Sequence, residues 1–350
     1  MRVAQVSPLY ESVPPKLYGG TERIVSYLTE ELVRQGHSVT LFASGDSTTS
    51  AELHPIADHS LRLDPSIRDP QVFTLLQHEA VRARAAEFDV IHFHTEYLHF
   101  PLVSGLGLTN ALFTLHGRLD VPGYAPLFAQ YRQLPLVSIS NHQRRPLPDL
   151  NWVGTVAHGL PKVVCHFERA PRGDYLAFVG RFSPEKRPDR AIEIARRSGM
   201  KLKIAAKVDA GDREYFETHI KPLLSQPHVE YIGEIDEREK CGFLGQARAL
   251  LFPIDWPEPF GLVMIEALSC GTPCVAWNAG AVPEILQEGV DGYIVDSMDS
   301  AVAAVHRAMQ LDRTAVRNSF EQRFTVERMT RDYLDIYRRL AAHRSGKAAA

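Results

Sequence analysis

Two successive series of short apolar segments, each followed by a helical or loop segment, dominate this chain. The first series is RVAQVS, HSVTLFAS, DVIHFH, ALFTLHG, LPLVSIS and NWVGTVAHG, and the second is YLAFVGR, LKIAAKV, VEYIGEI, ALLFPI, TPCVAW and GYIV. Short apolar runs that alternate with helices are typical of parallel strands buried on both faces. Each series therefore predicts a doubly wound parallel sheet, so we expect an α/β protein with two Rossmann-like domains.

The length of the chain supports this division. At 350 residues it exceeds one ordinary hydrophobic core, and two domains of about 150 to 170 residues are expected. Residues 166–173 are polar and contain a proline, and the strand-like YLAFVGR follows directly. We therefore predict one domain over residues 1–166 and a second over residues 167–325. A last helix, over residues 326–345, carries an apolar stripe that consists of Tyr333, Ile336, Tyr337 and Leu340.

Charge and hydropathy exclude some classes of partner. The chain has 39 basic and 42 acidic residues and a net charge of −3, which argues against a general nucleic-acid binder. The first residues, MRVAQVSPLYESVPP, indicate a core strand that enters a loop rather than a signal peptide. No apolar run approaches the roughly 18 to 20 residues that span a bilayer. We predict a cytoplasmic protein, and leave open a peripheral contact with the inner membrane face through Arg144 and Arg145 or the Arg-rich last helix.

Four cysteines are spread over the chain without a metal-type CxxC pair: Cys165, Cys241, Cys270 and Cys274. Cys270 and Cys274 only flank a Gly-Thr-Pro turn. We therefore predict structural thiols rather than a metal site or a disulfide.

Two carboxylates in one short segment indicate a ligand site. Glu258 lies between two prolines, so it belongs to a loop, and a helix is expected to begin near Gly261. Glu266 is the only charged residue of the apolar run LVMIEALSCG, so it should face a polar partner. The free amides near residues 261–263 would favour a phosphate. The alternative is that both acids cap or pair within the fold.

Residues 256–295, WPEPFGLVMIEALSCGTPCVAWNAGAVPEILQEGVDGYIV, resemble the signature of retaining glycosyltransferases of family 4, which have the GT-B fold. AFVGRFSPEKRPDRAIEIA, VEYIGEID, ISNHQR and VAHGL match the family in order, and RVAQVSPLYESVPPKLYGGTERIVSYLTEELVRQGHSVTLFAS and FDVIHFHTEY match more loosely. The resemblance implies two Rossmann-like domains that face each other across a cleft. The first domain would bind the acceptor, the second would bind the nucleotide-sugar donor, and the last helix would pack back on the first.

The resemblance also assigns roles to individual residues. The sequence contains no Asp-x-Asp pair that would chelate a metal, so protein cations must neutralise the diphosphate leaving group. Arg181 and Lys186, at the carboxyl end of the strand YLAFVGR, are the predicted pair, whereas Arg187 is expected to be solvated. Glu258, with backbone amides near Phe260 and Gly261, would hold the hydroxyls of the transferred sugar.

Further residues complete the expected site. Glu266 would bind the ribose hydroxyls, and the amides of Leu262 and Val263 would face a phosphate. The remaining predicted donor contacts are Gly19 and Gly20 in the first glycine loop, His116 near the sugar, and Ile232, Gly233 and Glu234 at the base. His92 and His94 are expected in the core, although a zinc site with His116 stays open by residue type. On the acceptor side, the resemblance points to Tyr10, Glu11, Lys16 and Tyr18.

Two segments depart from the family pattern. IAAKVDAGD stands where the family often has Gly-x-Gly, which puts the base contacts in doubt, although Lys207 could add a phosphate or acceptor contact. Asn278-Ala279-Gly280-Ala281 stands where a Gly-Gly pair is common, which narrows the space near the sugar.

The predicted function is transfer of a hexose from a nucleotide-diphosphate sugar to an acceptor hydroxyl, with retention and without a metal or other cofactor. A UDP-sugar is favoured over a GDP-sugar. The acceptor, whether a saccharide, a lipid-linked molecule or a small molecule, is not identified, and no nucleic acid is expected. The alternatives are a GT-B sugar-nucleotide epimerase or phosphorylase and a noncatalytic sugar-binding protein.

Overall fold

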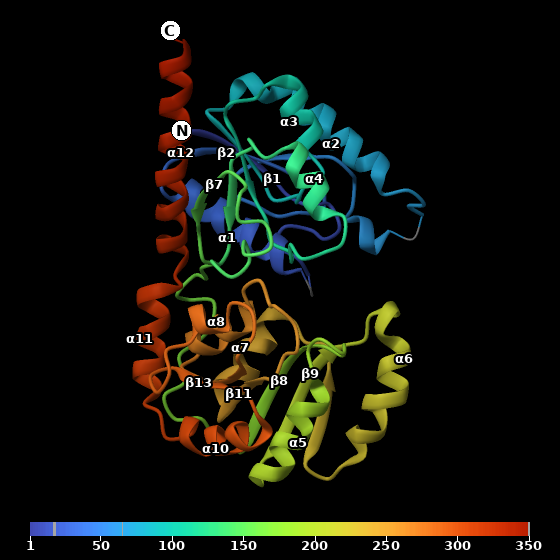
Figure 1. Cartoon of the computed structure of the whole chain (residues 1–350), viewed down its shortest axis with the longest axis vertical. Helices are drawn as coiled ribbons and strands as arrows, with labels where there is room; N and C mark the ends of the chain where they lie inside the picture. The colour runs from blue at the N-terminus through green and yellow to red at the C-terminus, as the bar shows by residue number, and fades with distance from the viewer. Residues whose placement is uncertain (17–18, 65, 349–350) are drawn as a thin grey trace. The chain divides into compact units, whose positions relative to one another are not determined.

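A computed structural model describes residues 1–16, 19–64 and 66–348 of the chain (Figure 1). The chain forms two compact units. Unit 1 comprises Met1–Gly159 and the C-terminal helix α12 (Val326–Ala348), and unit 2 comprises Leu160–Thr325. The sequence placed the division after residue 166. Residues 160–166 lie in unit 2 because Leu160 forms a bridge with Thr325, and because Cys165 is bonded to Cys241.

Unit 1 is built on a seven-stranded parallel sheet with the order β3-β2-β1-β4-β5-β6-β7. Its strands are β1 (Arg2–Val6), β2 (Ser38–Ala43), β3 (Glu52–Pro55), β4 (Val90–Phe93), β5 (Ala111–Thr114), β6 (Leu136–Ser138) and β7 (Trp152–Thr155). The edge strand β3 is absent from the sequence prediction. Its residues ELHP are partly exposed and alternate polar with apolar side chains, so it lacks the apolar run that marks the other strands.

Helices cover both faces of this sheet. On one face, α2 (Gln71–Arg84), α3 (Phe100–Leu106) and α4 (Tyr124–Gln130) enclose an aromatic core with strand residues such as Phe93 and Phe113. Elsewhere, α12 packs against α1 (Gly20–Arg34) and β4. Ile24, Leu28 and Leu32 form an apolar stripe on α1 and are completely buried, as are Tyr333 and Tyr337 of the predicted stripe of α12. The apolar face of each helix therefore fixes its place on the sheet.

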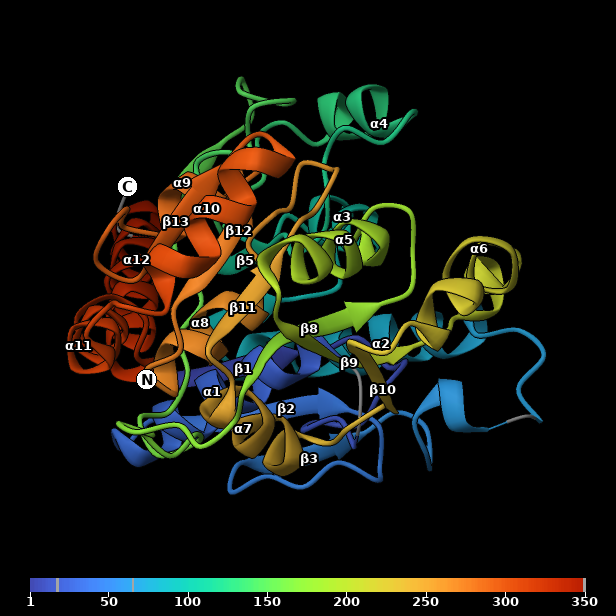
Figure 2. The same ribbon diagram turned by 90° about the horizontal axis from the view of Figure 1, so that it is seen from below.

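Unit 2 contains a six-stranded parallel sheet with the order β10-β9-β8-β11-β12-β13 (Figure 2). The strands are β8 (Tyr175–Arg181), β9 (Lys201–Lys207), β10 (Val229–Gly233), β11 (Ala249–Phe252), β12 (Cys274–Trp277) and β13 (Gly292–Val295). All six were predicted from their apolar runs. This order is that of a dinucleotide-binding Rossmann sheet.

The helices of unit 2 form two layers. The helices α5 (Pro188–Ser198) and α10 (Met298–Ala308) share one core with alternate residues of the strands, including Leu251 and Val275. α8 (Leu262–Ser269) contacts β11 and β12 and also packs on α7 (Glu237–Gln246) and α11 (Arg313–Arg323). The short helices α6 (Arg213–Tyr215) and α9 (Val282–Ile285) follow β9 and β12. Short 3-10 or π-helical segments of the whole chain lie at Leu61–Leu63, Ala85–Glu87, Ala210–Asp212, Phe216–Ile220 and Lys221–Ser225.

The strand order of each sheet reverses between its first and fourth strands, which are β1 and β4 in unit 1 and β8 and β11 in unit 2. The carboxyl end of such a strand pair is called the switch point of the sheet, and the loops there are where open α/β sheets bind ligands. The segments that follow these four strands therefore define the places to examine in each unit.

The prediction of structural thiols is wrong for Cys165 and Cys241, which form a disulfide with their Cα atoms 5.0 Å apart. Cys165 follows the last strand of unit 1 and Cys241 lies in α7, 76 residues later. Nothing in their spacing signals this proximity, because only the fold brings the two segments together. Cys270 and Cys274 are buried free thiols, as predicted.

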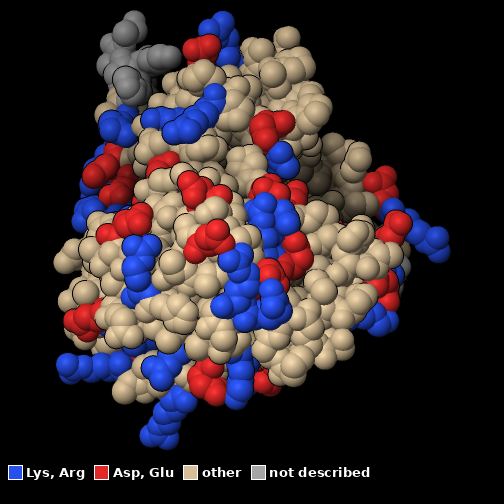
Figure 3. All heavy atoms as spheres, turned by 60° about the horizontal axis from the view of Figure 1, so that its bottom comes forward, with Lys and Arg blue, Asp and Glu red and all other residues tan. Residues whose placement is uncertain are grey.

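The surface carries no broad region of one charge on the face drawn in Figure 3, where acidic and basic side chains are interspersed. None of the helices in the described part of the chain is both long enough and apolar enough to cross a membrane.

Candidate active site

Lys186 and Glu258 form an ion pair between the loop after β8 and the loop after β11. The Lys186 ammonium contacts Glu258 Oε2, and the Trp256 indole Nε1 donates to the same oxygen at 3.0 Å. The Lys186 Nζ also lies 4.9 Å from the centre of the Trp256 ring. Both partners are largely buried, with side chains 16% and 11% exposed. The fold thus places one cation and one carboxylate side by side at the switch point of the sheet.

The backbone of Glu258 rests directly on Gly280. An added Cβ at Gly280 would lie 2.3 Å from both the amide nitrogen and the carbonyl oxygen of Glu258, and Gly280 has a φ of +58°. The amide of Ala281 donates to the Glu258 carbonyl at 2.9 Å. Only glycine fits at this position, because both the left-handed backbone and the close approach exclude a side chain. Gly280 and Ala281, which belong to the second segment that departs from the family pattern, therefore hold the Glu258 loop in place.

Arg181, the other predicted phosphate-binding cation, lies among acidic side chains. Its guanidinium contacts three carboxylates: Asp209 at 3.4 Å, Asp212 at 3.5 Å and Glu185 at 3.4 Å. Lys207 also binds Asp209, at 2.9 Å. Burial alone would raise the pKa of the Asp209 carboxyl, but hydrogen bonds from Lys207 and Arg181 hold this pKa below its usual value. A diphosphate would have to compete with these acids for Arg181.

Sequence reasoning missed the two aspartates that contact Arg181. Both lie in the segment VDAGD directly after β9, and β9 is the neighbour of β8, with Arg181 opposite Lys207 in the register. The carboxyl end of the adjacent strand was the available signal, but the segment was judged only as a departure from Gly-x-Gly.

The start of helix α8 has the predicted form. Gly261 is its N-cap with a φ of +92°, and an added Cβ would meet Met264 Cε at 2.6 Å. Phe260 is buried just before it. Leu262 and Val263 occupy the first turn, where backbone N–H groups lack partners within the helix and favour an anion. The contact of these residues with a phosphate stays a prediction.

Glu266 is buried and pairs with Lys240 of α7 at 2.6 Å. The alternative reading, that both acids pair within the fold, therefore holds for Glu266 as well as for Glu258. Lys240 was missed by the sequence analysis. It lies one turn into α7, which begins with a capping box of Asp236 and Glu239, and no local pattern links it to Glu266.

The predicted base contacts lie at the end of the edge strand β10. Ile232 and Glu234 are exposed, and Gly233 has a φ of +85° beside a register shift between β10 and β9. Tyr231 donates to the carbonyl of Ala206 at 2.9 Å, which anchors this end of the strand. The structure leaves these residues accessible, and their role stays a prediction.

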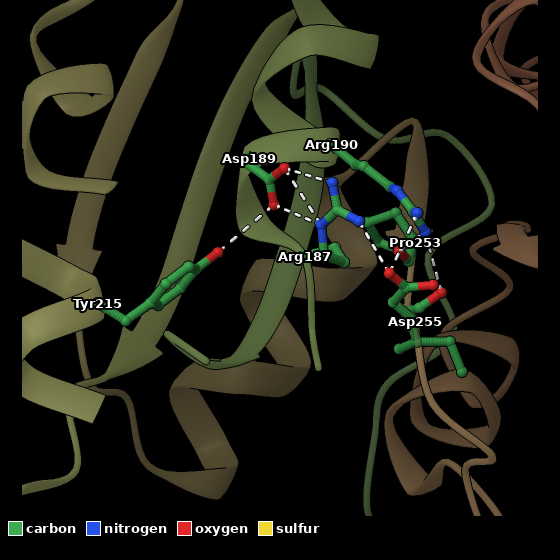
Figure 4. Close-up of polar contacts among 7 residues, drawn as sticks. Arg187, Asp189, Arg190, Tyr215, Pro253 and Asp255 are labelled. Carbon is green, nitrogen blue, oxygen red and sulfur yellow. Dashed lines mark hydrogen bonds and ion pairs between the residues drawn. The ribbon is translucent and has the colours of Figure 1, made fainter. Parts of the chain in front are cut away.

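Arg187 is not the solvated side chain that the sequence predicted. It is half-buried and binds Asp189 and Asp255 (Figure 4). Its φ of +51° places it in the left-handed region, where a residue with a side chain is uncommon.

The glycine loop of unit 1 lies beside two buried acids. An added Cβ at Gly19, the N-cap of α1, would lie 2.7 Å from Pro15 Cβ and 3.2 Å from Glu22 Oε2, and Gly20 is the first residue of the helix. Burial, with the nearby charge of Glu11, raises the pKa of Glu22 to about 7, although its backbone hydrogen bond acts in the opposite sense. Gly19 is thus needed for packing.

The predicted acceptor residues are not alike in exposure. Tyr10 is 51% exposed, whereas Glu11 is buried and pairs with Arg62 at 3.0 Å. Lys16 is exposed and pairs with Asp46 at 3.4 Å. Tyr18 lies outside the described residues.

A series of hydrogen bonds between uncharged side chains connects His116 to the buried core of unit 1. His116 Nε2 lies 2.9 Å from His94 Nδ1, and His94 Nε2 lies 2.8 Å from Gln5 Oε1. Gln5 Nε2 donates to the Tyr337 hydroxyl of α12 at 3.1 Å. The same hydroxyl lies 2.7 Å from His92 Nδ1. His92 and His94 therefore support the core and orient His116.

Burial keeps these histidines neutral. It lowers the pKa of His92 and of His94 well below the usual value and lowers the pKa of His116 to about 3. In the part of the chain that is described, no group of three or more His, Cys, Asp or Glu side chains is arranged to hold a metal ion. The open question of a zinc site at His92, His94 and His116 thus finds no geometric support.

Glu96 is a titratable group that the sequence analysis missed. It follows β4 at the switch point of unit 1, with a φ of +52°. Its Oε1 accepts hydrogen bonds from the amides of His116 at 2.7 Å and Gly117 at 2.9 Å. Burial raises the pKa of Glu96 to about 7 in spite of these two bonds, which act to lower it. Glu96 therefore sets the position of the backbone at His116.

The two Rossmann-like parallel sheets define the class of fold, which is the GT-B fold of solved structures that resemble this chain. Residues 18–156 match the family described as Glycosyltransferase Family 4, and residues 167–323 match Glycosyl transferases group 1. The chain belongs to glycosyltransferase family 4, and it is an enzyme that transfers a sugar from a nucleotide sugar. The resemblance seen in the sequence is confirmed.

The chain is similar in sequence to a glycogen synthase and in structure to two solved proteins. The glycogen synthase of Mycobacterium tuberculosis (strain CDC 1551 / Oshkosh) is 27% identical over 385 residues, which cover 95% of this chain and 91% of that protein. AviGT4, a glycosyltransferase involved in avilamycin A biosynthesis, has a TM-score of 0.75 at 24% identity and 98% coverage of both chains. Anabaena HepE, solved in complex with UDP and glucose, has a TM-score of 0.72 at 14% identity, with 96% of this chain and 99% of that chain covered.

Proposed function

We propose that this enzyme transfers a hexose from a UDP-sugar to an acceptor hydroxyl, with retention of configuration and without a metal ion. The observation that carries the proposal is the Lys186–Glu258 pair at the switch point of unit 2, beside the start of helix α8. The complex of HepE with UDP and glucose supports a UDP-sugar as donor.

The charges of unit 2 suit a nucleotide-diphosphate sugar. Lys186 would move from Glu258 to the diphosphate, and the α8 amides of Leu262 and Val263 would bind a phosphate oxygen. Arg181 would add a second cation when the diphosphate displaces its carboxylate partners. Glu258 would then accept hydrogen bonds from the sugar hydroxyls, and Glu266 would accept them from the ribose. Each of the four charged side chains would thus exchange an internal partner for the donor.

The chemical step needs no protein nucleophile. The bond between the anomeric carbon and the diphosphate oxygen breaks, and a bond to the acceptor oxygen forms on the same face of the sugar. The acceptor proton passes to an oxygen of the departing diphosphate. Lys186 and Arg181 stabilise the negative charge that develops on that group, which is the main catalytic contribution.

Unit 1 would supply the acceptor site. Its switch point carries the exposed Tyr10 and Lys16, which we assign to the acceptor, and the titratable Glu96. Gly19, Gly20 and His116 of the same unit stay predicted donor contacts. The uncharged Tyr10 side chain would recognise a hydroxyl through a hydrogen bond rather than through charge. A peripheral membrane contact through Arg144 and Arg145 would suit a lipid-linked acceptor, and vesicle co-sedimentation with anionic lipid tests it.

Thermal-shift measurements with UDP, GDP, ADP and their common sugar conjugates, all in EDTA, test the donor. We expect a rise in melting temperature with UDP and a UDP-hexose, because a ligand that binds only the folded state stabilises it. Analysis of the products then decides the reaction class. Transfer to a hydroxyl supports the proposal, whereas an epimerised sugar nucleotide, a sugar phosphate, or the absence of a shift with every nucleotide contradicts it.

A further inference from the structure

The loops that carry Lys186 and Glu258 are joined a second time by Arg187 and Asp255. Arg187 Nη1 donates to Asp255 Oδ2 at 2.9 Å, and Arg190 lies 3.3 Å from the same carboxylate (Figure 4). Arg187 directly follows Lys186 in the chain. Asp255 directly precedes Trp256, whose indole binds Glu258. A displacement of Arg187 or Asp255 would therefore also displace the adjacent Lys186 or Trp256, and with them the Lys186–Glu258 pair.

The guanidinium of Arg187 is itself fixed in place. Its Nε lies 2.9 Å from Asp189 Oδ1 and its Nη2 lies 2.7 Å from Asp189 Oδ2, which makes a bidentate pair. Asp189 lies in the first turn of α5, and the Tyr215 hydroxyl donates to it at 3.5 Å. Paired forks of this kind hold the guanidinium plane in one orientation. Helix α5 thus presents the remaining Arg187 nitrogen to Asp255.

The main chain of residues 253–255 is tied to the same elements. Arg190 Nη1 donates to the carbonyls of Pro253 at 3.4 Å and Ile254 at 3.3 Å, and its guanidinium lies 4.6 Å from the centre of the Trp277 ring. The amide of Asp255 donates to the carbonyl of Glu185 at 2.8 Å. These bonds set the distance between the two loops just before the chain reaches Glu258.

The left-handed backbone conformation of Arg187 indicates that its side chain has a functional role. Its φ of +51° is disfavoured for a residue with a Cβ and is readily adopted by glycine. A strained residue that the surrounding contacts hold in place is a reason to look for a functional role. Folding stability gives little reason for the Arg187–Asp255 bond, because Asp255 is 53% exposed and such pairs are screened by solvent.

We propose that Arg187 and Asp255 are positioning residues, which hold the two loops so that Lys186 and Glu258 meet the donor in the right geometry. The inference rests on the proposed function, since it assumes that this pair binds the donor. Arg187 and Asp255 act through their neighbours and make no contact with the reacting atoms. A small displacement of a binding group is enough to lower the rate of a positioned reaction.

Three variants separate position from stability. Arg187→Gly removes the guanidinium and relieves the left-handed backbone, Arg187→Gln removes the guanidinium and keeps that backbone, and Asp255→Asn removes the partner charge. We expect kcat/KM to fall about tenfold in all three, while Arg187→Gly melts at or above the temperature of Arg187→Gln. Arg196→Gln, which breaks the exposed Arg196–Glu193 pair on the same helix, is the matched control and should keep wild-type kcat/KM.

Fluorine NMR of the 5-fluorotryptophan protein gives a readout that needs no turnover. The chain has three tryptophans, and Trp256→Phe assigns the signal of interest. We expect the Trp256 signal to shift or broaden in Arg187→Gly and Asp255→Asn, while the Trp152 signal of unit 1 stays unchanged. An unchanged Trp256 signal together with kcat/KM within twofold of wild type would overturn the proposal. If the wild type turns over no nucleotide sugar, the donor assignment fails, and the Trp256 signal alone still decides whether the bridge positions the loop.

Discussion

The two units build their switch points from opposite kinds of polar group on sheets of the same order. In unit 2, charged side chains form ion pairs: Lys186 with Glu258, Lys240 with Glu266, and Arg181 with three acids. In unit 1, Gln5, His94, His116 and Tyr337 form a buried network of neutral groups. A charged edge suits a diphosphate, and a neutral edge suits hydroxyls. In a repeated fold, a few residues after the strands therefore determine which ligand each unit binds.

The largest expected effect comes from removal of the cation of unit 2. We expect Lys186→Ala to lower kcat by about 10²- to 10³-fold, because one preorganised group aimed at developing charge is worth this much. Steady-state kinetics with the preferred donor measures it. Lys201→Ala, which breaks an exposed pair with Asp174, is the control. Wild-type turnover of Lys186→Ala would remove Lys186 from the site.

Acid should destabilise unit 1 before unit 2. Burial lowers the pKa of several histidines of unit 1, and it does so most strongly at His92, His94, His99, His116 and His158. Below the ordinary histidine pKa of about 6.5, the unfolded chain binds more protons at these sites than the folded chain, so stability falls as the pH falls, by up to about 1.4 kcal/mol per pH unit for each. Glu22 and Glu96, with pKa values raised to about 7, oppose this loss between about pH 7 and 4.5.

The net result is a loss of stability in unit 1 as the pH falls from about 6.5 to 4.5, because histidines outnumber the two acids. Lowered carboxyl pKa values in unit 2, as at Asp189 and Asp209, cost stability only below the usual aspartate pKa of 3.8. Hydrogen exchange followed by mass spectrometry at pH 7, 5.5 and 4.5 compares the two units. Loss of protection in unit 2 first would contradict the comparison.

Gly280→Ala should damage the Glu258 loop. The new Cβ would overlap the Glu258 backbone, so we expect a loss of about 2 to 4 kcal/mol in unfolding free energy, with reduced activity. Gly199→Ala is a matched control, since Gly199 has a similar φ of +69° but no atom within 4 Å of an added Cβ. It should cost only about 1 to 2 kcal/mol and preserve activity. Equal effects of the two changes on kcat/KM would show that Gly280 does not position Glu258.

Tyr337→Phe should give the smallest effect. It removes the hydroxyl that accepts a hydrogen bond from Gln5 and lies beside His92. We expect a loss of about 1 to 3 kcal/mol in unfolding free energy, because these two buried side chains each lose a hydrogen-bond partner. The change should lower activity only through His116, and nucleotide affinity should stay as in wild type. Urea unfolding and nucleotide titration measure the two quantities. A large loss of nucleotide affinity would contradict the division of roles between the units.

The short apolar segments of the sequence predicted both sheets, because parallel strands buried on both faces need nearly continuous apolar sequence. The prediction missed β3, whose edge position tolerates the polar Glu52 and His54. Glu258, Gly261 and Glu266 could be singled out because prolines, glycine and a lone charge mark them locally, whereas Lys186 was assigned from the family resemblance. Lys240, Glu96 and the Cys165–Cys241 bond could not be predicted, because each depends on contacts between segments that are distant in sequence.

Calorimetric titration of UDP into the wild-type protein and into Lys186→Ala, in EDTA and at two salt concentrations, measures whether the charged edge of unit 2 binds the donor. We predict that UDP binds the wild type without a metal, that salt weakens this binding, and that Lys186→Ala loses most of it. Equal affinity of the two proteins for UDP, unaffected by salt, would contradict the assignment of the charged edge of unit 2 to the donor.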